Sequence, residues 1–372
     1  MRGGWRLGLL GALVLLGAAA GSAPRSPYEA SLGIYVIGGS RPIPDWGSLL
    51  QVPGVVGVAL DEFWETVEPT EGAYDWTLLD ARVAVAAKAG RSVNLRLLPG
   101  ISTPSWVYKK GAAPFSFVDT NPFHGEQFYP EGHHQQTLGK SLQIPVPWDP
   151  TFEASWERTV AAMGSHFAGS SGIAMVHVTG PNTHSAEMHL PRTDEDRQAW
   201  QRLGYTDEKL LDAWKRSIDA WAQAFPKVPL AIDLSPTIFK DKVTERVARY
   251  GIEKYGQRFF LQNDILLAES KRDREDWDVL ARSSKVATIG FQRQLLRLGS
   301  QGVPQDEKLR LRRANFEGMF TLGLSLGARY FEVGVGEVKD FPEVVSRFAK
   351  ELAGSASTSG SAEAVRGPSN SR

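Results

Sequence analysis

The stretch VVGVALDEFWETVEPTEGAYDWTLLDARVAVAAKAGRSVNLRL, residues 55–97, contains one complete strand–helix–strand unit. Val55–Leu60 is a short apolar run, Leu78–Ala89 has the residue spacing of a helix, and Ser92–Leu97 is a second apolar run. Two strands joined through a helix pair in parallel, because the crossover carries the chain back to the edge from which it started. This stretch therefore predicts a parallel α/β sheet.

The same alternation continues along most of the chain. Eight strands with intervening helices in about 325 residues predict a (β/α)8 TIM barrel. The predicted strands are Gly33–Ile37, Val55–Leu60, Ser92–Leu97, Ile173–Val178, Pro229–Leu234, Arg258–Gln262, Val286–Gly290 and Ala328–Val333. The helical patterns are Leu78–Ala89, Thr151–Phe167, Asp207–Phe225, Lys240–Tyr255, Arg274–Arg282 and Lys308–Leu326.

An open doubly wound sheet is the alternative to the barrel. Such sheets commonly carry a glycine-rich phosphate turn after the first strand. Here Gly38-Gly39-Ser40 lacks the G-x-G-x-x-G spacing and leads into prolines instead of a helix. The barrel is the better prediction.

The two ends of the chain differ from the region between them. Residues 1–23 combine Arg2 and Arg6, an apolar run, and a small-residue site ending at Ala23, which predicts a cleavable signal peptide. Residues 354–372 are rich in Ser, Gly and Ala and predict a disordered tail. The barrel is expected within residues 24–353, in a secreted or periplasmic protein that no longer contacts the membrane after signal cleavage.

Composition excludes some functions. The 42 basic and 42 acidic residues balance, so no net charge favours nucleic acid as a partner. The chain has no cysteine and thus no disulfide. It also lacks a P-loop and a Gly-x-Ser-x-Gly elbow, which disfavours nucleotide chemistry and serine hydrolysis. The sequence leaves the oligomeric state open.

A short motif follows the second predicted strand. Residues 64–80 read W-x-x-x-E-P-x-x-G-x-Y-D-W-x-x-L-D and lead to the third strand. This pattern resembles the N-terminal part of the retaining (β/α)8 glycoside hydrolases, the clan of beta-galactosidase-like and cellulase-like enzymes. The residues themselves suit a structural connector, because Glu68-Pro69 and Gly72 favour a tight turn and Asp75 can cap the next helix. The resemblance implies a carbohydrate-cleaving barrel whose partner is an oligo- or polysaccharide.

That clan places an acid/base Glu after the fourth strand, commonly as Asn-Glu, and a nucleophilic Glu at the end of the seventh. Here the fourth strand is followed by Gly180-Pro181-Asn182, and the first Glu is Glu187. The seventh strand has Gln292 where the nucleophile is expected, and an amide cannot attack an anomeric carbon as a carboxylate does. This sequence therefore departs from the clan at both positions.

Two interpretations follow from this departure. In the first, Glu187 is the acid/base and Glu332, inside the eighth apolar run, is the second carboxylate; the alternative role of Glu332 is an ion pair inside the barrel. Glu62 and Asp233 are weaker substitutes. In the second, the barrel binds a glycan without cleaving it, which Gln292 favours.

Both interpretations need polar and aromatic side chains at the C-terminal ends of the strands, where barrel sites lie. Arg96, Asn182, Gln262, Asn263 and Gln292 are predicted to contact sugar hydroxyls, and Trp64, Trp106 and Trp148 to stack on sugar rings. No cofactor is predicted.

A long loop between Gly111 and Gln143 holds His124, His133 and His134 with several carboxylates. Its length favours a lid. Neither this loop nor His177, His184 and His189 shows a recognised metal-ligand spacing, so no metal is predicted, and His177 is interpreted as a core histidine. An enzyme that uses the histidine-rich loop with a metal such as zinc is the weakest of the alternatives.

Overall fold

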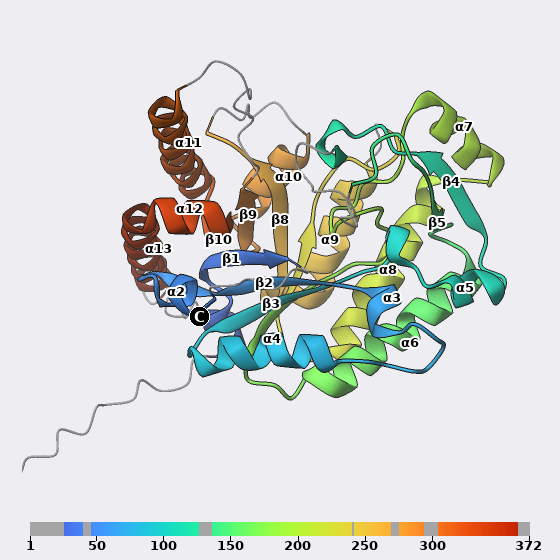
Figure 1. The fold of residues 1–372 in the computed structure, drawn as a ribbon, viewed down its shortest axis with the longest axis horizontal. Coiled ribbons are helices and arrows are strands. Elements are labelled where there is room, and N and C mark those ends of the chain that lie inside the picture. The colour runs from blue at the N-terminus through green and yellow to red at the C-terminus, as the bar shows by residue number, and fades with distance from the viewer. Residues whose placement is uncertain are drawn as a thin grey trace, which may run out of the picture.

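A closed barrel of parallel strands forms the centre of the protein. The computed structural model describes residues 26–39, 46–125, 136–239, 242–268, 275–293 and 304–363. Around the barrel the strands follow the order β1, β2, β3, β6, β7, β8, β9, β10 and back to β1 (Figure 1). The predicted TIM barrel is confirmed. The strands are β1 (Gly33–Gly39), β2 (Val55–Phe63), β3 (Ser92–Leu98), β6 (Ile173–His177), β7 (Leu230–Asp233), β8 (Phe259–Leu266), β9 (Ile289–Arg293) and β10 (Ala328–Gly334).

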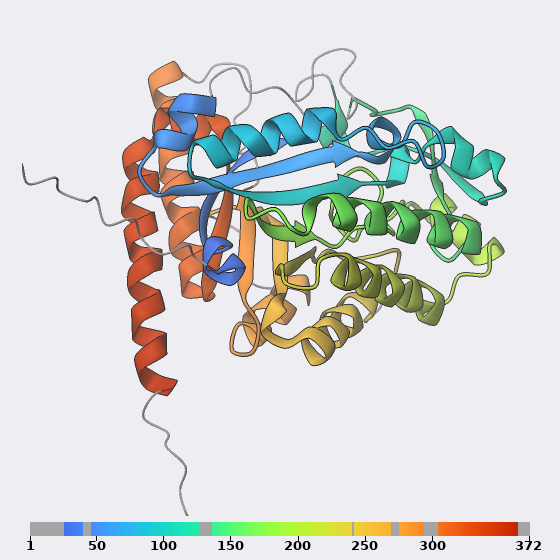
Figure 2. The same ribbon diagram turned by 90° about the horizontal axis from the view of Figure 1, so that it is seen from below.

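Helices surround the strands on the outside (Figure 2). They bury apolar faces against the barrel, and α8 places Leu211, Trp214, Ile218 and Trp221 on its buried side at helical spacing. The helices are α1 (Pro27–Ala30), α2 (Trp46–Gln51), α3 (Trp64–Val67), α4 (Thr77–Lys88), α5 (Ser105–Lys109), α6 (Pro150–Phe167), α7 (Asp194–Arg202), α8 (Asp207–Ala224), α9 (Val243–Tyr255), α10 (Glu275–Ser283), α11 (Gln305–Ser325), α12 (Val335–Asp340) and α13 (Pro342–Glu363). In the part of the chain that the structure describes, none of them combines the length and apolarity needed to cross a membrane.

The N-terminal end of the barrel is closed by α1. The ring of Tyr28 meets Phe260 edge to face at 5.7 Å, and the hydroxyl of Tyr35 donates to the carbonyl of Ala30. Phe260 and Tyr330 belong to a small apolar cluster inside the barrel. Apolar side chains thus fill this end of the barrel, whereas the polar side chains of the interior lie towards the opposite end.

The W-x-x-x-E motif forms a connector, as its residues suggest. The carboxylate of Glu68 is buried and accepts hydrogen bonds from the indole Nε1 of Trp64 (2.8 Å), the amide of Gly72 (2.8 Å) and the hydroxyl of Thr159 (2.5 Å). Asp75 accepts from the amide of Thr77 at the start of α4 over 2.9 Å. The motif ties the second strand to α4 and α6 and supplies no group to the barrel interior.

Three parts of the fold differ from the sequence-based prediction. The seventh strand was placed too early: it runs over β9, and Val286 is exposed before it. The long loop contains an antiparallel hairpin, β4 (Pro114–Val118) and β5 (Ser141–Pro145), whose alternating burial is typical of a strand packed on one face. Helix α13 continues through Glu363, ten residues into the predicted tail. The predicted signal peptide, His133 and His134 lie outside the described residues.

Candidate active site

Arg96 lies at the centre of the polar layer inside the barrel. Its guanidinium donates to Asp61 Oδ1 over 2.5 Å, to Glu332 Oε2 over 2.9 Å and to Gln292 Oε1 over 3.0 Å. The three partners come from β2, β10 and β9, so the side chain of Arg96 joins its own strand, β3, to three other strands across the barrel. Burial of a guanidinium is tolerated here because two carboxylates compensate its charge.

Glu332 is sealed inside this layer. It has no exposed surface, and Asn94 and Gln262 donate to its carboxylate beside Arg96. Burial raises the pKa of Glu332, but the positive charge of Arg96 and the contact with His177 outweigh it and lower the pKa to about 2. These contacts favour the ion-pair role for Glu332 over a carboxylate that meets a substrate.

His177 lies beside Glu332 and is also fully buried. Its Nδ1 is 2.8 Å from Asp233 Oδ2, and its Nε2 is 3.5 Å from Glu332 Oε1. Burial lowers the pKa of His177, but the two carboxylates outweigh it and raise the pKa to about 9. His177 is thus a buried cation at neutral pH and lies in the core as predicted, but only its Nδ1 makes a hydrogen bond, so the prediction that both ring nitrogens are satisfied holds in part.

Asp264 is a carboxylate that the sequence analysis passed over. It lies near the C-terminal end of β8, and Gln262 Nε2 donates a hydrogen bond to its Oδ1 over 2.8 Å. Burial raises the pKa of Asp264 well above its ordinary value, and the negative charges of Asp233 and Glu187 raise it further. The sequence could have predicted that Asp264 points into the barrel, since Gln262 and Asp264 are two residues apart and therefore lie on the same face of the strand.

The stretch after β6 brings Glu187 to the same end of the barrel. Glu187 bridges to Asp233 at the end of β7, where the amide of Met188 donates to the Asp233 carbonyl over 3.1 Å. The side chain of Glu187 is 22% exposed, and Ser185 donates to its Oε2 over 3.1 Å. Glu187 is therefore an acidic group at the C-terminal rim that remains open to solvent.

Asn182 shapes this stretch from within. Its Nδ2 donates to the carbonyls of Ala186 (2.7 Å) and Glu187 (2.8 Å), and its Oδ1 accepts from the amide of Gly180 (2.5 Å). With its amide engaged at both ends, Asn182 holds the backbone of Glu187. These contacts favour a positioning role over the predicted contact with sugar.

The predicted amide contacts fall into two groups. Gln292 is partly exposed beside Arg96 and can meet a ligand at the rim. Gln262 and Asn263 are fully buried, and Asn263 Nδ2 donates to the carbonyl of Leu234 over 3.0 Å. The burial of Gln262 and Asn263 contradicts their predicted contact with sugar hydroxyls. Gln262 points into the barrel towards Asp264 and Glu332, whereas Asn263, the next residue of the strand, lies on the other face.

The predicted tryptophans pack outside the barrel. Trp64 has no exposed surface and meets Trp106 and Trp156 at ring distances of 5.7 and 5.0 Å, which contradicts a stacking role for Trp64. Trp106 is half-buried beneath Arg158, whose guanidinium lies 5.2 Å from the ring. Trp148 is half-buried against Trp200 at 5.7 Å. The roles of Trp106 and Trp148 remain predictions.

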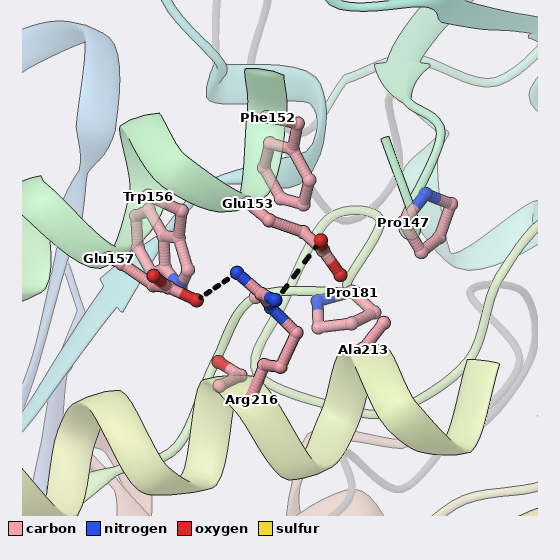
Figure 3. Close-up of a pocket in the computed structure, with 10 residues that line it drawn as sticks. Pro147, Phe152, Glu153, Trp156, Glu157, Pro181, Ala213 and Arg216 are labelled. Carbon is pink, nitrogen blue, oxygen red and sulfur yellow. Dashed lines mark ion pairs between the residues drawn. The ribbon is translucent and has the colours of Figure 1, made fainter. Parts of the chain in front are cut away.

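A shallow pocket lies between α6 and α8, under the start of the stretch that carries Glu187 (Figure 3). Arg216 of α8 reaches across it to Glu157 at 2.9 Å and Glu153 at 3.4 Å. Glu62, a weaker candidate for the second catalytic carboxylate, also lies outside the barrel interior, where it forms an ion pair with Arg82 at 2.9 Å. Neither place offers carboxylates to the barrel mouth.

Comparison with known proteins relates about half of this chain to a known family. The sequence profile of glycoside hydrolase family 42, described as beta-galactosidase, matches residues 47–228. That range includes the connector motif and the stretch with Glu187. The chain is a distant homologue of the family 42 beta-galactosidases. The resemblance to glycoside hydrolases is thereby confirmed.

Beta-galactosidase BbgII of Bifidobacterium bifidum is 24% identical to this family 42 homologue over 178 residues, which are 48% of this chain and 23% of BbgII. The chain thus matches about a quarter of the length of that curated relative.

Solved structures support the fold. The catalytic domain of a beta-amylase from Paenibacillus polymyxa superposes with a TM-score of 0.55 at 14% identity, over 86% of this chain and 99% of that one. A beta-galactosidase from the psychrophilic Marinomonas ef1 gives a TM-score of 0.52 at 12% identity, over 88% and 60%. Both identities are low, so these likenesses speak for the barrel alone.

Proposed function

We propose that this barrel hydrolyses O-glycosidic bonds in an oligo- or polysaccharide, with Glu187 as one of two catalytic carboxylates. The homology to family 42 supports the reaction class, and the family name makes β-galactosides the first substrates to test. The observation that carries the proposal is a pair of carboxylates in different environments at one end of the barrel: Glu187 at the rim and Asp264 below it.

The two carboxylates suit different tasks. Glycoside hydrolysis needs one carboxylic acid that protonates the leaving oxygen and one carboxylate that acts on the anomeric carbon or on a water. Burial and the neighbouring negative charges raise the pKa of Asp264, which favours its protonated form, so we assign the proton to Asp264 and the negative charge to Glu187. The sequence alone predicts Glu187 as the acid/base. In this proposal Glu187 is instead the base or the nucleophile.

Glu332 is the competing second carboxylate. Its contacts with Arg96 and Asn94 would have to open before it met a sugar. We therefore propose that Glu332 orients Arg96, which in turn holds Gln292 near the ligand.

Substrates with different leaving groups distinguish these roles. The wild type would be compared with Glu187→Gln, Asp264→Asn and Glu332→Gln on a dinitrophenyl β-galactoside, which needs no protonation, and on an oligosaccharide, which does. We expect Asp264→Asn to lose more than about 100-fold on the oligosaccharide and little on the activated substrate, and Glu187→Gln to lose activity on both. Full activity in Glu187→Gln and Asp264→Asn would refute the pair.

A glycan-binding barrel without catalysis is the second candidate, and Gln292 favours it. Gln292 lies next to Glu332 in the sheet register, where the clan carries its nucleophile. In this case sugar binding would be retained by Glu187→Gln and lost by Gln292→Ala, and no substrate would be cleaved by the wild type.

A further inference from the structure

A compact group of metal-ligating side chains lies outside the barrel interior. Asp119, His124 and His184 are all buried, and one ligand atom from each lies within 4.8 Å of the other two. Asp119 follows β4, His124 belongs to the turn Pro122–His124, and His184 comes from the stretch after β6. The cluster is therefore assembled from two segments, one with Asp119 and His124 and one with His184, which lies 60 residues after His124.

The distances suit a first-row transition metal. Asp119 Oδ2 is 2.7 Å from His124 Nδ1 and 3.3 Å from His184 Nε2. In a tetrahedral zinc site with bonds of about 2.0–2.1 Å, neighbouring ligand atoms stand about 3.3 Å apart. A cation between the three groups thus requires only small shifts of their side chains.

The surroundings hold the ligands in place. The amide of Asn121 donates to Asp119 Oδ1 over 2.9 Å, which turns Oδ2 towards the two imidazoles. The side chain of Asn121 is 3.3 Å from His124 Nε2, the ring nitrogen that faces away from Asp119. Outer contacts of this kind fix ring orientation in metal sites. The hydroxyl of Thr137 is 2.5 Å from Asp119 Oδ2 and 3.1 Å from His184 Nε2, close to a fourth position.

We propose that Asp119, His124 and His184 bind one divalent transition-metal ion, with Zn²⁺ as the best fit, and that the ion fastens the β4–β5 hairpin to the stretch that carries Glu187. Two imidazoles and one carboxylate are ligands that Zn²⁺ prefers. A water or the hydroxyl of Thr137 completes the coordination. The ion would hold the position of the stretch after β6, since His184 is three residues from Glu187.

The test is a titration of the purified, metal-stripped protein with zinc, in which isothermal calorimetry measures the binding. Thermal unfolding is then compared with zinc and with EDTA. We expect one Zn²⁺ per chain and a higher Tm with zinc than with EDTA. His184→Gln and Asp119→Asn should weaken zinc binding by more than the roughly 10–100-fold that loss of an outer contact causes.

The matched control is His166→Gln, because His166 and Asp80 form a partly exposed His–Asp pair at 2.8 Å. This variant should bind zinc as the wild type does. A wild type that binds no stoichiometric zinc, or equal zinc affinity in the wild type and a folded His184→Gln, would overturn the proposal. The folded state of each variant is checked by its circular dichroism, and Thr137→Val provides a milder second variant whose zinc affinity should fall less.

Discussion

The guanidinium of Arg96 lies 2.9 Å from the carboxylate of Glu332, and both side chains are buried inside the barrel. The two residues are separated by 236 positions in the sequence, and their strands, β3 and β10, are separated in the barrel by β2 and β1. Each charge is compensated in the interior by the other, together with Asp61 for Arg96 and His177 for Glu332. The pair therefore connects the stability of the barrel to the geometry of the site above it.

Removal of one charge from the Arg96–Glu332 pair should lower the stability of the folded protein. Arg96→Met leaves Glu332 buried without its main partner, and we expect the free energy of unfolding to fall by about 3–5 kcal/mol in urea denaturation. The double variant Arg96→Met/Glu332→Gln should recover at least about 1 kcal/mol of this loss. Simple additivity of the two changes would contradict the coupling.

The stability should fall as the pH rises through the pKa of His177. The pKa of this imidazole is raised from 6.5 to about 9 in the folded protein, so its contribution is complete below pH 6.5 and is lost as pH approaches and passes 9. A shift of this size corresponds to about 3 kcal/mol. Urea denaturation between pH 6 and 9.5 measures it. His177→Gln should be less stable at pH 6 and should show a flatter dependence, whereas His166→Gln should follow the wild type.

Asn182 should affect the action of Glu187 without contacting the substrate. Asn182→Ala removes the two donors that hold the carbonyls of Ala186 and Glu187. We expect kcat to fall by about 10–100-fold with a smaller change in KM, because a misplaced catalytic group weakens mainly the transition state. A change confined to KM would indicate that Asn182 binds the sugar directly.

Gly100 should tolerate no side chain. It adopts φ +51°, and a Cβ there would lie 2.0 Å from the carbonyl oxygen of Thr183, in the stretch that carries Glu187. Gly100→Ala should lower the free energy of unfolding by about 2 kcal/mol or more and reduce activity. Gly47→Ala in α2 is the control: nothing lies within 4 Å of its Cβ, and alanine favours the helix.

The export signal is tested by expression of the full chain. If residues 1–23 are a signal peptide, the secreted protein should begin near Pro24, which N-terminal sequencing detects. Substitution of Ala23 by a bulky residue should slow the cleavage and shift the product to higher mass. An intact N-terminus on the exported protein would contradict the cleavage site.

The fold could be predicted because its signals are local. Strands such as Ser92–Leu98 are short apolar runs, and helices such as α8 repeat apolar residues every three to four positions. Each pattern is visible within about 20 residues. The β4–β5 hairpin was missed because its strands are half-exposed and are separated by the loop that contains His124.

The candidate site could be predicted only in part. The position of Glu187 after the fourth barrel strand follows from strand order, because barrel sites lie at the C-terminal ends of the strands. The roles of Trp64 and Gln262 could not be predicted in the same way, because the sequence pattern around a tryptophan or an amide near a strand end is the same whether its side chain is exposed or buried. Their burial depends on helices and strands from elsewhere in the chain.

By itself the sequence determined the barrel, the end of the barrel that carries the site, and the stretch that holds Glu187. These features depend on periodicity and on chain order. Only the tertiary structure decided that Glu332 is sealed by Arg96, that Asp264 lies close enough to Glu187 for the two charges to interact, and that Asp119 meets His184. The physical reason is that pKa values, ion pairs and metal ligation depend on distances of a few ångströms between residues far apart in the chain, which closure of the barrel alone determines.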